Sequence, residues 1–457
     1  MAGSVGPDAE SNQHRIEPHI PSMIDVTIEK LIYGGEGLAH HDGSTVFVPF
    51  VLPGEVAGIT PVEQKKKFIR AKLDKVVRPS PARIAARCPH FGVCGGCDYQ
   101  QIAYEPQLEF KKEILRETLR RIGRIDWPGE ITTHASPPWA YRNRAQWKVR
   151  PLEAAEEGDS AEGPEGKAKL GIGYFKANTT ALCAVETCEI VSPLLLKTLL
   201  ALRSALAAGE LPRGLREIEA FVNASDSQLL LTATFAGFPS RAAEHAATFR
   251  RIAPEITSLL FHDPSRDRME LYGPGYIEYE AAGNAYRVGH FSFFQVNKFL
   301  AETLVSVAVG SETGGRMALD LFAGVGLFSI PLAQKFEKVL AIESNPAATR
   351  DMESNVRGQG AIEVRTADVD RFMARSKERP DLVVLDPPRA GMSPEAMQKL
   401  VKMGPARITY LSCEPPTLAR DLAILISGGY SCTEVHLIDL FPQTFHMETI
   451  IRLRRGR

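Results

Sequence analysis

The sequence predicts a chain of three folded parts: a small antiparallel β-barrel, a central α+β region and a C-terminal α/β domain. Three observations predict this organisation. The chain has 457 residues, enough for two or three hydrophobic cores. Turn signals recur between short alternating segments near the N-terminus, and strand and helix patterns alternate towards the C-terminus. The expected divisions are a disordered tail over 1–20, the barrel over 21–80, the central domain over 81–290 and the α/β domain over 291–457.

The barrel is predicted from residues 22–78. Short segments that alternate apolar and polar residues, such as Thr45-Val-Phe-Val-Pro-Phe, are separated there by glycine-containing turns. This pattern is typical of a small antiparallel barrel. Prolines at 79 and 81 end it.

The α/β domain is predicted from apolar strand patterns that alternate with helical ones. Expected strands are 317–322, 338–343, 361–366, 382–386 and 407–412, and expected helices are 327–336, 346–357, 394–402 and 416–427. Such alternation predicts a parallel sheet covered on both faces. In the central region, helices are expected over 108–122 and near 193–208.

Composition and cysteine usage favour a cytoplasmic protein. The polar N-terminus lacks the charged start and apolar core of a secretory signal, and there is no long uncharged apolar run to span a membrane. The seven cysteines are an odd number, and three of them lie between 88 and 97. In a chain of this length they do not resemble a disulfide framework.

Positive charge is concentrated although the net charge is −1. An acidic insert at 153–165 cancels two basic groups in the sum. The first group is Lys65, Lys66, Lys67, Arg70, Lys72, Lys75, Arg78 and Arg83; the second is Arg142, Arg144, Lys148 and Arg150. With Phe68, Tyr141 and Trp147 interleaved, they suit phosphate contacts and base stacking, although an ordinary solvated face is the alternative.

A glycine loop marks a candidate cofactor site. Gly324-Val-Gly follows a predicted strand and opens a helix, and Glu343 ends the next strand, where it can accept hydrogen bonds from ribose. Ser329 occupies the place of the third glycine of a dinucleotide fingerprint, which disfavours a pyrophosphate. A tight structural turn is the alternative. A cationic sulfonium cofactor, S-adenosyl-L-methionine, suits the acidic lining of Asp320, Glu343, Asp368 and Asp386.

Cys413 is the candidate nucleophile. It follows a predicted strand, and we expect Arg389 and the start of the next helix to stabilise its thiolate. Uracil C5 is too electron-poor to attack a methyl donor, but thiolate addition at C6 makes C5 nucleophilic. A base must then remove the C5 proton, and Glu448 is the candidate. In a folded RNA the target base must also be flipped out.

Cys88, Cys94 and Cys97 form a candidate metal site with glycines between them. A fourth ligand would come from Cys188 or Cys183. Four thiolates suit an iron–sulfur cluster or zinc, and the spacing leaves both open.

These residues together resemble the uracil-C5 RNA methyltransferase family, in the branch with an N-terminal TRAM barrel and a [4Fe-4S] cluster. The resemblance rests on the following segments: Cys88-Pro-His-Phe-Gly-Val-Cys-Gly-Gly-Cys, Phe293-Phe-Gln-Val-Asn, Leu319-Asp-Leu-Phe-Ala-Gly, Leu385-Asp-Pro-Pro-Arg-Ala-Gly, Leu411-Ser-Cys-Glu-Pro-Pro and Phe441-Pro-Gln-Thr-Phe-His-Met-Glu. It implies a TRAM (OB-like) barrel, a central α+β domain that holds the cluster and a Rossmann-like methyltransferase domain.

The resemblance also implies residue roles and a substrate. Cys413 is implied as nucleophile and Glu448 as proton acceptor. Implied cofactor contacts are Gln295, Phe322, Glu343 and Asp386, with Asp368 on the adenine side; implied cluster ligands are Cys88, Cys94, Cys97 and Cys188. The expected partner is RNA, with 23S rRNA favoured, and we expect a monomer that binds no membrane. Glu414 stands where many members carry Asn, and Leu327 where some do.

Three alternatives remain beside this hypothesis. The first is a methyltransferase for the tRNA T-loop uridine. The second is an RNA cytosine-C5 methyltransferase, which the absence of a thiol beside Asp386 disfavours. The third is a non-catalytic iron–sulfur RNA-binding protein, against which Cys413 and Glu448 argue.

Overall fold

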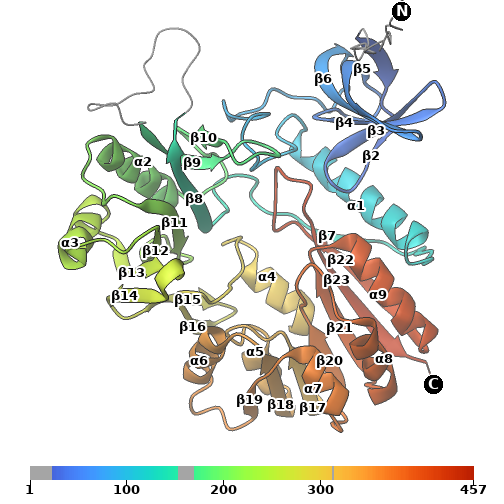
Figure 1. Ribbon diagram of the computed structural model, residues 1–457. Coiled ribbons are helices and arrows are strands. Elements are labelled where there is room, and N and C mark those ends of the chain that lie inside the picture. The colour runs from blue at the N-terminus through green and yellow to red at the C-terminus, as the bar shows by residue number, and fades with distance from the viewer. Residues whose placement is uncertain (1–22, 153–168, 311–312, 457) are drawn as a thin grey trace, which may run out of the picture. The chain divides into compact units, whose positions relative to one another are not determined.

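The computed structural model describes residues 23–152, 169–310 and 313–456 (Figure 1). The tail expected over 1–20 and the acidic insert at 153–165 lie outside these residues. The chain divides into two compact units, a smaller one up to Pro81 and a larger one from Ala82 that also includes Tyr33–Gly35. No helix in the described ranges is long and apolar enough to cross a membrane.

The smaller unit is one six-stranded sheet in the order β1-β5-β6-β4-β3-β2. Its strands are β1 (Ile24–Thr27), β2 (Lys30–Leu31), β3 (Glu36–His41), β4 (Ser44–Pro49), β5 (Val56–Gln64) and β6 (Phe68–Arg78). Alternate residues such as Val26, Val46 and Ile59 point into a core. The expected all-antiparallel arrangement is wrong in one place, because β4 and β6 pair in parallel.

The larger unit contains a seven-stranded sheet in the order β10-β9-β8-β11-β12-β13-β14. Its strands are β8 (Arg144–Pro151), β9 (Leu170–Phe175), β10 (Leu182–Ala184), β11 (Leu215–Val222), β12 (Leu229–Phe235), β13 (Ile256–Asp263) and β14 (Arg268–Tyr272). Helix α2 (Pro193–Ala207) was expected and α3 (Ala242–Ile252) was not; both pack on this sheet. The short helix η1 (Pro264–Arg266) and the hairpin of β15 (Tyr276–Ala281) and β16 (Asn284–Gly289) follow.

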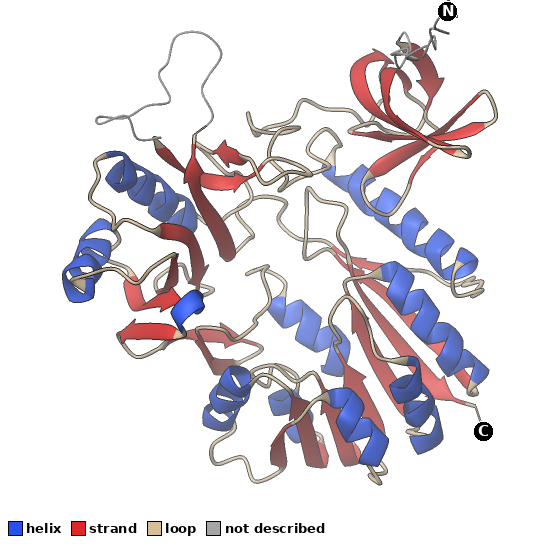
Figure 2. Cartoon of the chain, viewed as in Figure 1, coloured by secondary structure: helices blue, strands red, loops and turns tan. Residues whose placement is uncertain are grey.

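The larger unit also contains an eight-stranded sheet in the order β19-β18-β17-β20-β21-β23-β22-β7 (Figure 2). Its strands are β7 (Thr132–His134), β17 (Gly315–Leu321), β18 (Phe336–Glu343), β19 (Ile362–Thr366), β20 (Leu382–Leu385), β21 (Arg407–Ser412), β22 (Tyr430–Ile438) and β23 (Glu448–Arg455). The expectation of a wholly parallel sheet is corrected at β23, which is antiparallel to β21 and β22. The chain returns from β22 to β23 without a helical crossover, and such a connection joins neighbours antiparallel.

Helices cover both faces of the eight-stranded sheet. Their bounds are α1 (Tyr104–Arg121), α4 (Ala301–Val305), η2 (Ser306–Gly310), α5 (Ser329–Ala333), α6 (Pro346–Asn355), α7 (Val369–Arg375), α8 (Pro394–Met403) and α9 (Pro415–Ser427). Helices α7, α8 and α9 pack in series, and α1 packs against α9 (Figure 1). Right-handed crossovers place α5 and α6 on the opposite face. Helix α1 begins earlier than the expected residue 108, because Pro106 is tolerated within a first helical turn.

Candidate active site

One edge of the eight-stranded sheet collects most of the predicted catalytic and cofactor residues. Phe322 follows β17, Glu343 ends β18, Asp386 follows β20 and Cys413 follows β21. The antiparallel strand β23 starts at this same edge with Glu448, and Ser412 pairs with Thr449 in the register. Residues widely separated in the sequence therefore meet at the end of a sheet where ligands commonly bind.

The glycine loop is held in an unusual backbone conformation. Phe322, Gly324 and Gly326 have φ values of 63°, 56° and 92°, in the left-handed region. For a phenylalanine this costs about 1–2 kcal/mol. Glu343 fixes the loop by accepting hydrogen bonds from the backbone N–H of Gly324 at 2.9 Å and of Asn345 at 2.7 Å. A side chain added at Gly324 would meet no atom within 4 Å, so open space lies beside the loop.

Buried carboxyl groups crowd this edge. Burial, together with the charges of Asp386 and Glu343, raises the pKa of Asp320 to about 7, although the Ser329 hydroxyl opposes this by donating to it at 2.5 Å. Burial also raises the pKa of Asp386 and, with the nearby Asp386 charge, that of Glu448. Within the described residues, Oε1 of Glu448 has no hydrogen-bond partner. The edge therefore favours a proton or a positively charged group.

The surroundings of Cys413 favour the neutral form of its thiol. Burial raises its pKa to about 12, and the charges of Glu448 and Asp386 add to the effect. Arg389 opposes the shift through its charge and a hydrogen bond to the thiol. Arg389 thus favours the thiolate as expected, but burial and the charges of two carboxylates outweigh its effect.

Gln295 and Asp368, the two remaining residues expected to contact the cofactor, differ from each other in their surroundings. Gln295 is buried, and its backbone carbonyl accepts from the Asn143 amide at 3.1 Å. Asp368 is exposed and caps α7 by accepting from the backbone N–H of Arg371 at 2.9 Å. This capping contact engages one carboxylate oxygen and was not foreseen from the sequence.

A cavity of 330 Å³, here called the cysteine cavity, brings together the four cysteines implied as cluster ligands. Cys88, Cys94, Cys97 and Cys188 all contribute to its lining, and Cys183 does not. Burial raises the pKa of each of the four lining thiols, to about 12 for Cys94. Among the residues described, no three or more His, Cys, Asp or Glu side chains converge on a single metal-ion position.

The basic groups are partly neutralised. Lys65 pairs with Glu63 at 2.8 Å and Arg70 with Glu36 at 2.6 Å, whereas Lys66 is exposed. In the second group, Lys148 pairs with Glu217.

The expected base stacking is wrong for two of the three aromatic residues. Tyr141 and Trp147 are both fully buried. Their rings belong to the packed interior, so no RNA base can reach them.

Comparisons with known proteins agree with this arrangement. The TRAM domain description matches residues 22–73, the TRM5/TYW2 methyltransferase domain residues 293–403 and the tRNA (Uracil-5-)-methyltransferase family residues 376–456. A 23S rRNA (uracil(1939)-C(5))-methyltransferase of Klebsiella pneumoniae strain 342 is 32% identical over 95% of this chain and 96% of its own length. The chain belongs to the uracil-C5 RNA methyltransferase family.

Two further proteins are similar to this chain over most of its length. An Aquifex aeolicus protein named as an uncharacterized RNA methyltransferase is 32% identical over 94% of this chain and 98% of its own length. The crystal structure of a Pyrococcus abyssi tRNA (uracil-54, C5)-methyltransferase with S-adenosyl-L-homocysteine is similar with a TM-score of 0.71 and 25% identity. It covers 94% of this chain and 100% of that chain. The expected family, TRAM domain and methyltransferase fold are confirmed.

Sequence reasoning missed the residues that hold the segment before Glu448. Gln107 and Lys111 on α1 are fully buried, and they contact Gln443 and Asp439. Their spacing of four residues, in line with Leu115, places them on the apolar face of the helix. Two polar residues on an otherwise apolar helix face are the signal in the sequence that could have identified them.

The crowded edge predicts how the Cys413 thiol responds to loss of a neighbouring charge. In Asp386→Asn, one of the two carboxylates that raise the thiol pKa is removed, so this pKa should fall. A fall of one unit gives about tenfold more thiolate at pH 8. The thiolate fraction is measured by the rate at which iodoacetamide alkylates Cys413 in the protein between pH 7 and 9. Mass spectrometry of the peptide that contains Cys413 follows this rate. The exposed cap variant Asp368→Asn should leave the rate unchanged, and equal rates in both variants would contradict the electrostatic account.

Proposed function

We propose that this protein transfers a methyl group from S-adenosyl-L-methionine to C5 of a uridine in 23S rRNA. One observation carries the proposal. In a chain of this family, Cys413, Glu448 and Asp386 lie within electrostatic range of one another at the carboxyl edge of the methyltransferase sheet.

In the proposed reaction, the Cys413 thiol first loses its proton to solvent. The thiolate sulfur then bonds to C6 of the uracil, and the electrons of the C5=C6 double bond move to C5 and its conjugated carbonyl, which makes C5 the nucleophile. When bound, S-adenosyl-L-methionine supplies the methyl group that C5 takes up. Glu448 then accepts the C5 proton, the electrons of that bond form the C5=C6 double bond, and the C6–S bond breaks to release Cys413. Burial raises the pKa of Glu448 and makes its carboxylate a stronger base.

The sheet edge fits a cationic cofactor. Asp386 and Glu343 supply negative charge, and the left-handed conformation of Phe322 and the open space beside Gly324 leave room for a ligand. We assign the cofactor contacts to Gln295, Phe322, Glu343, Asp386 and, through its second carboxylate oxygen, Asp368. A positive charge beside Asp386 would also lower the pKa of Cys413, so cofactor binding would help to form the nucleophile.

The RNA target is inferred from relatives. The full-length relatives from Klebsiella pneumoniae and Alkalilimnicola ehrlichii, at 30–32% identity, carry names that specify uracil 1939 of 23S rRNA. A tRNA uridine is the second candidate, since the Pyrococcus abyssi structure is of a tRNA methyltransferase. We further infer a monomer in the cytoplasm. All seven cysteines are unpaired, as suits a reducing compartment.

The cysteine cavity is proposed to hold a [4Fe-4S] cluster through Cys88, Cys94, Cys97 and Cys188. One feature supports this proposal. The four thiols all line one cavity of 330 Å³, and four thiolates are a ligand set that such a cluster uses. Cys183 is left out because it does not line the cavity.

The proposed activity is tested by methyl transfer from radiolabelled S-adenosyl-L-methionine to unmodified 23S rRNA and tRNA transcripts. Wild-type protein should label the rRNA, and a 5-fluorouridine transcript should trap it covalently, because fluorine cannot leave as a cation. Cys413→Ala should lose both signals, whereas Cys432→Ala, on β22 of the same sheet, should keep both. Labelling of tRNA alone would select the second candidate, and full activity in Cys413→Ala would refute the mechanism.

Glu448→Gln should stop the reaction after methyl transfer. The amide cannot accept the C5 proton, so the methylated adduct with natural uridine should accumulate as a slowly migrating protein–RNA band on a denaturing gel. Glu395→Gln, on the exposed side of α8, serves as the control and should show no such band. Product formation by Glu448→Gln without an adduct would exclude this role.

The metal proposal predicts a difference between two neighbouring cysteines. Anaerobically purified wild type should contain iron and acid-labile sulfide in equal amounts. Cys188→Ser should lose most of both, because it removes a ligand, while Cys183→Ser should retain them. Zinc without iron in the wild type, or equal loss in the two variants, would contradict the assignment.

A further inference from the structure

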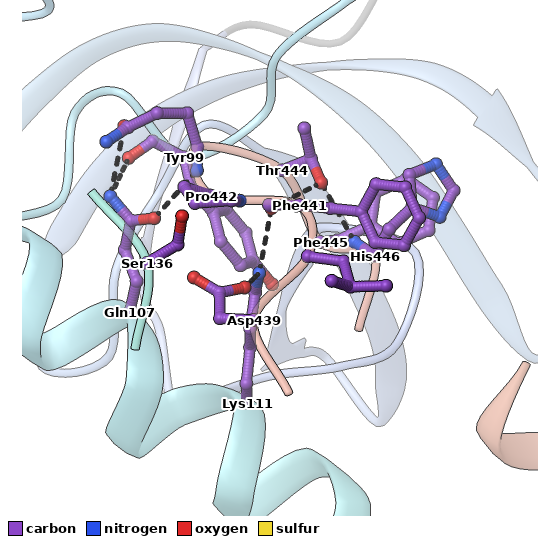
Figure 3. A network of polar contacts seen from close by, with 12 residues as sticks. Tyr99, Gln107, Lys111, Ser136, Asp439, Phe441, Pro442, Thr444, Phe445 and His446 are labelled. Carbon is purple, nitrogen blue, oxygen red and sulfur yellow. Dashed lines mark hydrogen bonds and ion pairs between the residues drawn. The ribbon is translucent and has the colours of Figure 1, made fainter. Parts of the chain in front are cut away.

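The segment over residues 439–447, here called the 439–447 loop, connects β22 to Glu448 and is held from outside the catalytic sheet (Figure 3). Its contacts come from α1, from the residues that follow Cys97 and from the central region. Thr444, Phe445 and His446 of this loop also line the cysteine cavity. Glu448 follows two residues after His446.

Consecutive carbonyl groups of the 439–447 loop accept hydrogen bonds from other parts of the chain. The acceptor and donor pairs are Leu440 O with the Asn297 amide at 3.2 Å, Phe441 O with Lys111 Nζ at 3.0 Å, Pro442 O with the Tyr141 hydroxyl at 3.0 Å and Gln443 O with the backbone N–H of Asp98 and of Tyr99, both at 3.0 Å. Buried backbone groups need partners, and here five donors come from distant segments, although Phe441 O also accepts from Thr444 within the loop. The course of the loop is therefore set by its surroundings.

Gln107 makes the most direct contact with the turn of this loop. Its side-chain oxygen accepts from the backbone N–H of Gln443 at 3.0 Å, and its Nε2 donates to Oε1 of Gln443 at 3.1 Å. Nε2 also donates to the carbonyls of Ile102 at 2.9 Å and Tyr99 at 3.2 Å. Gln443 has φ of 67°, a left-handed conformation that persists only when its surroundings enforce it.

Lys111, one turn further along α1, anchors the start of the loop. Its ammonium group pairs with Oδ1 of Asp439 at 2.6 Å, and both side chains are fully buried. Burial lowers the pKa of Lys111, and the charge of Asp439 opposes this. The second oxygen of Asp439 accepts from the Tyr104 hydroxyl at 2.9 Å, so α1 contacts this carboxylate twice.

We infer that Gln107 and Lys111 are positioning residues for the proton-removal step, acting through the 439–447 loop on Glu448. The inference rests on the proposed function. Neither residue has a hydrogen bond or ion pair with Cys413, which is carried by the connection between β21 and α9. Loosening the loop should therefore displace the base and leave the nucleophile in place.

The test separates the two chemical steps in a single turnover. The substrate is a 23S rRNA transcript made with [5-³H]uridine, and the donor is ¹⁴C-methyl S-adenosyl-L-methionine. Tritium release reports removal of the C5 proton, whereas ¹⁴C bound to RNA or to the adduct reports methyl transfer. Gln107→Met keeps the side-chain length and removes the hydrogen bonds. It should slow tritium release about tenfold relative to methyl transfer, as expected for a misplaced base, and should accumulate the denaturation-resistant adduct.

A second variant covers the case in which Gln107→Met does not fold. Lys111→Met combined with Asp439→Asn removes both buried charges together, which avoids an unpaired ion and retains an acceptor for Tyr104. It removes the donor to Phe441 O and should shift the ratio of the two rates in the same direction. Thr198→Val is the control, since it deletes a buried hydrogen bond to Leu194 on α2, away from the loop. It should lower the melting temperature without changing the ratio.

The outcomes distinguish this inference from the proposed function. Equal slowing of both steps in the α1 variants, or the same shift in Thr198→Val, would overturn the positioning role while leaving the methyltransferase activity intact. Absence of both signals in the wild type would overturn the proposed function and this inference with it.

Discussion

The desolvation of neighbouring acidic groups is the constraint on which the site depends. The carboxyl edge of the eight-stranded sheet holds Asp320, Asp386 and Glu448 in surroundings that disfavour their charged forms, and the Cys413 thiol shares those surroundings. Folding must supply the free energy that holds these groups together. The arrangement becomes favourable when a cation or a proton arrives, which is the property expected of a site for a positively charged methyl donor.

The same edge shows why catalysis in this chain is not confined to its α/β domain. The carboxyl ends of four parallel strands lie at this edge, so their end residues meet there because of the sheet topology. Glu448 instead lies on an antiparallel strand, which the chain reaches through a long connection. That connection is held by α1 and by residues beside Cys97. The 439–447 loop therefore connects the candidate base both to the cysteine cavity and to the buried pair of Lys111 and Asp439.

The sequence was sufficient where the chain obeys a local rule. Apolar strands that alternate with helices predicted the α/β domain, and strand ends predicted Asp386 and Cys413, because the carboxyl ends of parallel strands share an edge. It was insufficient where a property arises from distant neighbours. Burial raises the pKa of Cys413, and the charges of Glu448 and Asp386, which are distant in the sequence, add to this effect. The burial of Tyr141 and Trp147 depends on packing that an interleaved basic pattern does not reveal.

The pairing of β7 with β22 bears on how the chain can fold during synthesis. Nε2 of His134 on β7 lies 3.2 Å from Nδ1 of His436 on β22, although the two residues are 302 positions apart in the sequence. At about 5–20 residues per second, a ribosome needs roughly 15 to 60 seconds to make the intervening chain. Throughout that interval β7 lacks its neighbour, and the apolar side of α1 lacks α9. The eight-stranded sheet can therefore be completed only at the end of translation, and an α/β domain cut out at residue 291 would leave the edge of β22 open to pairing with other chains.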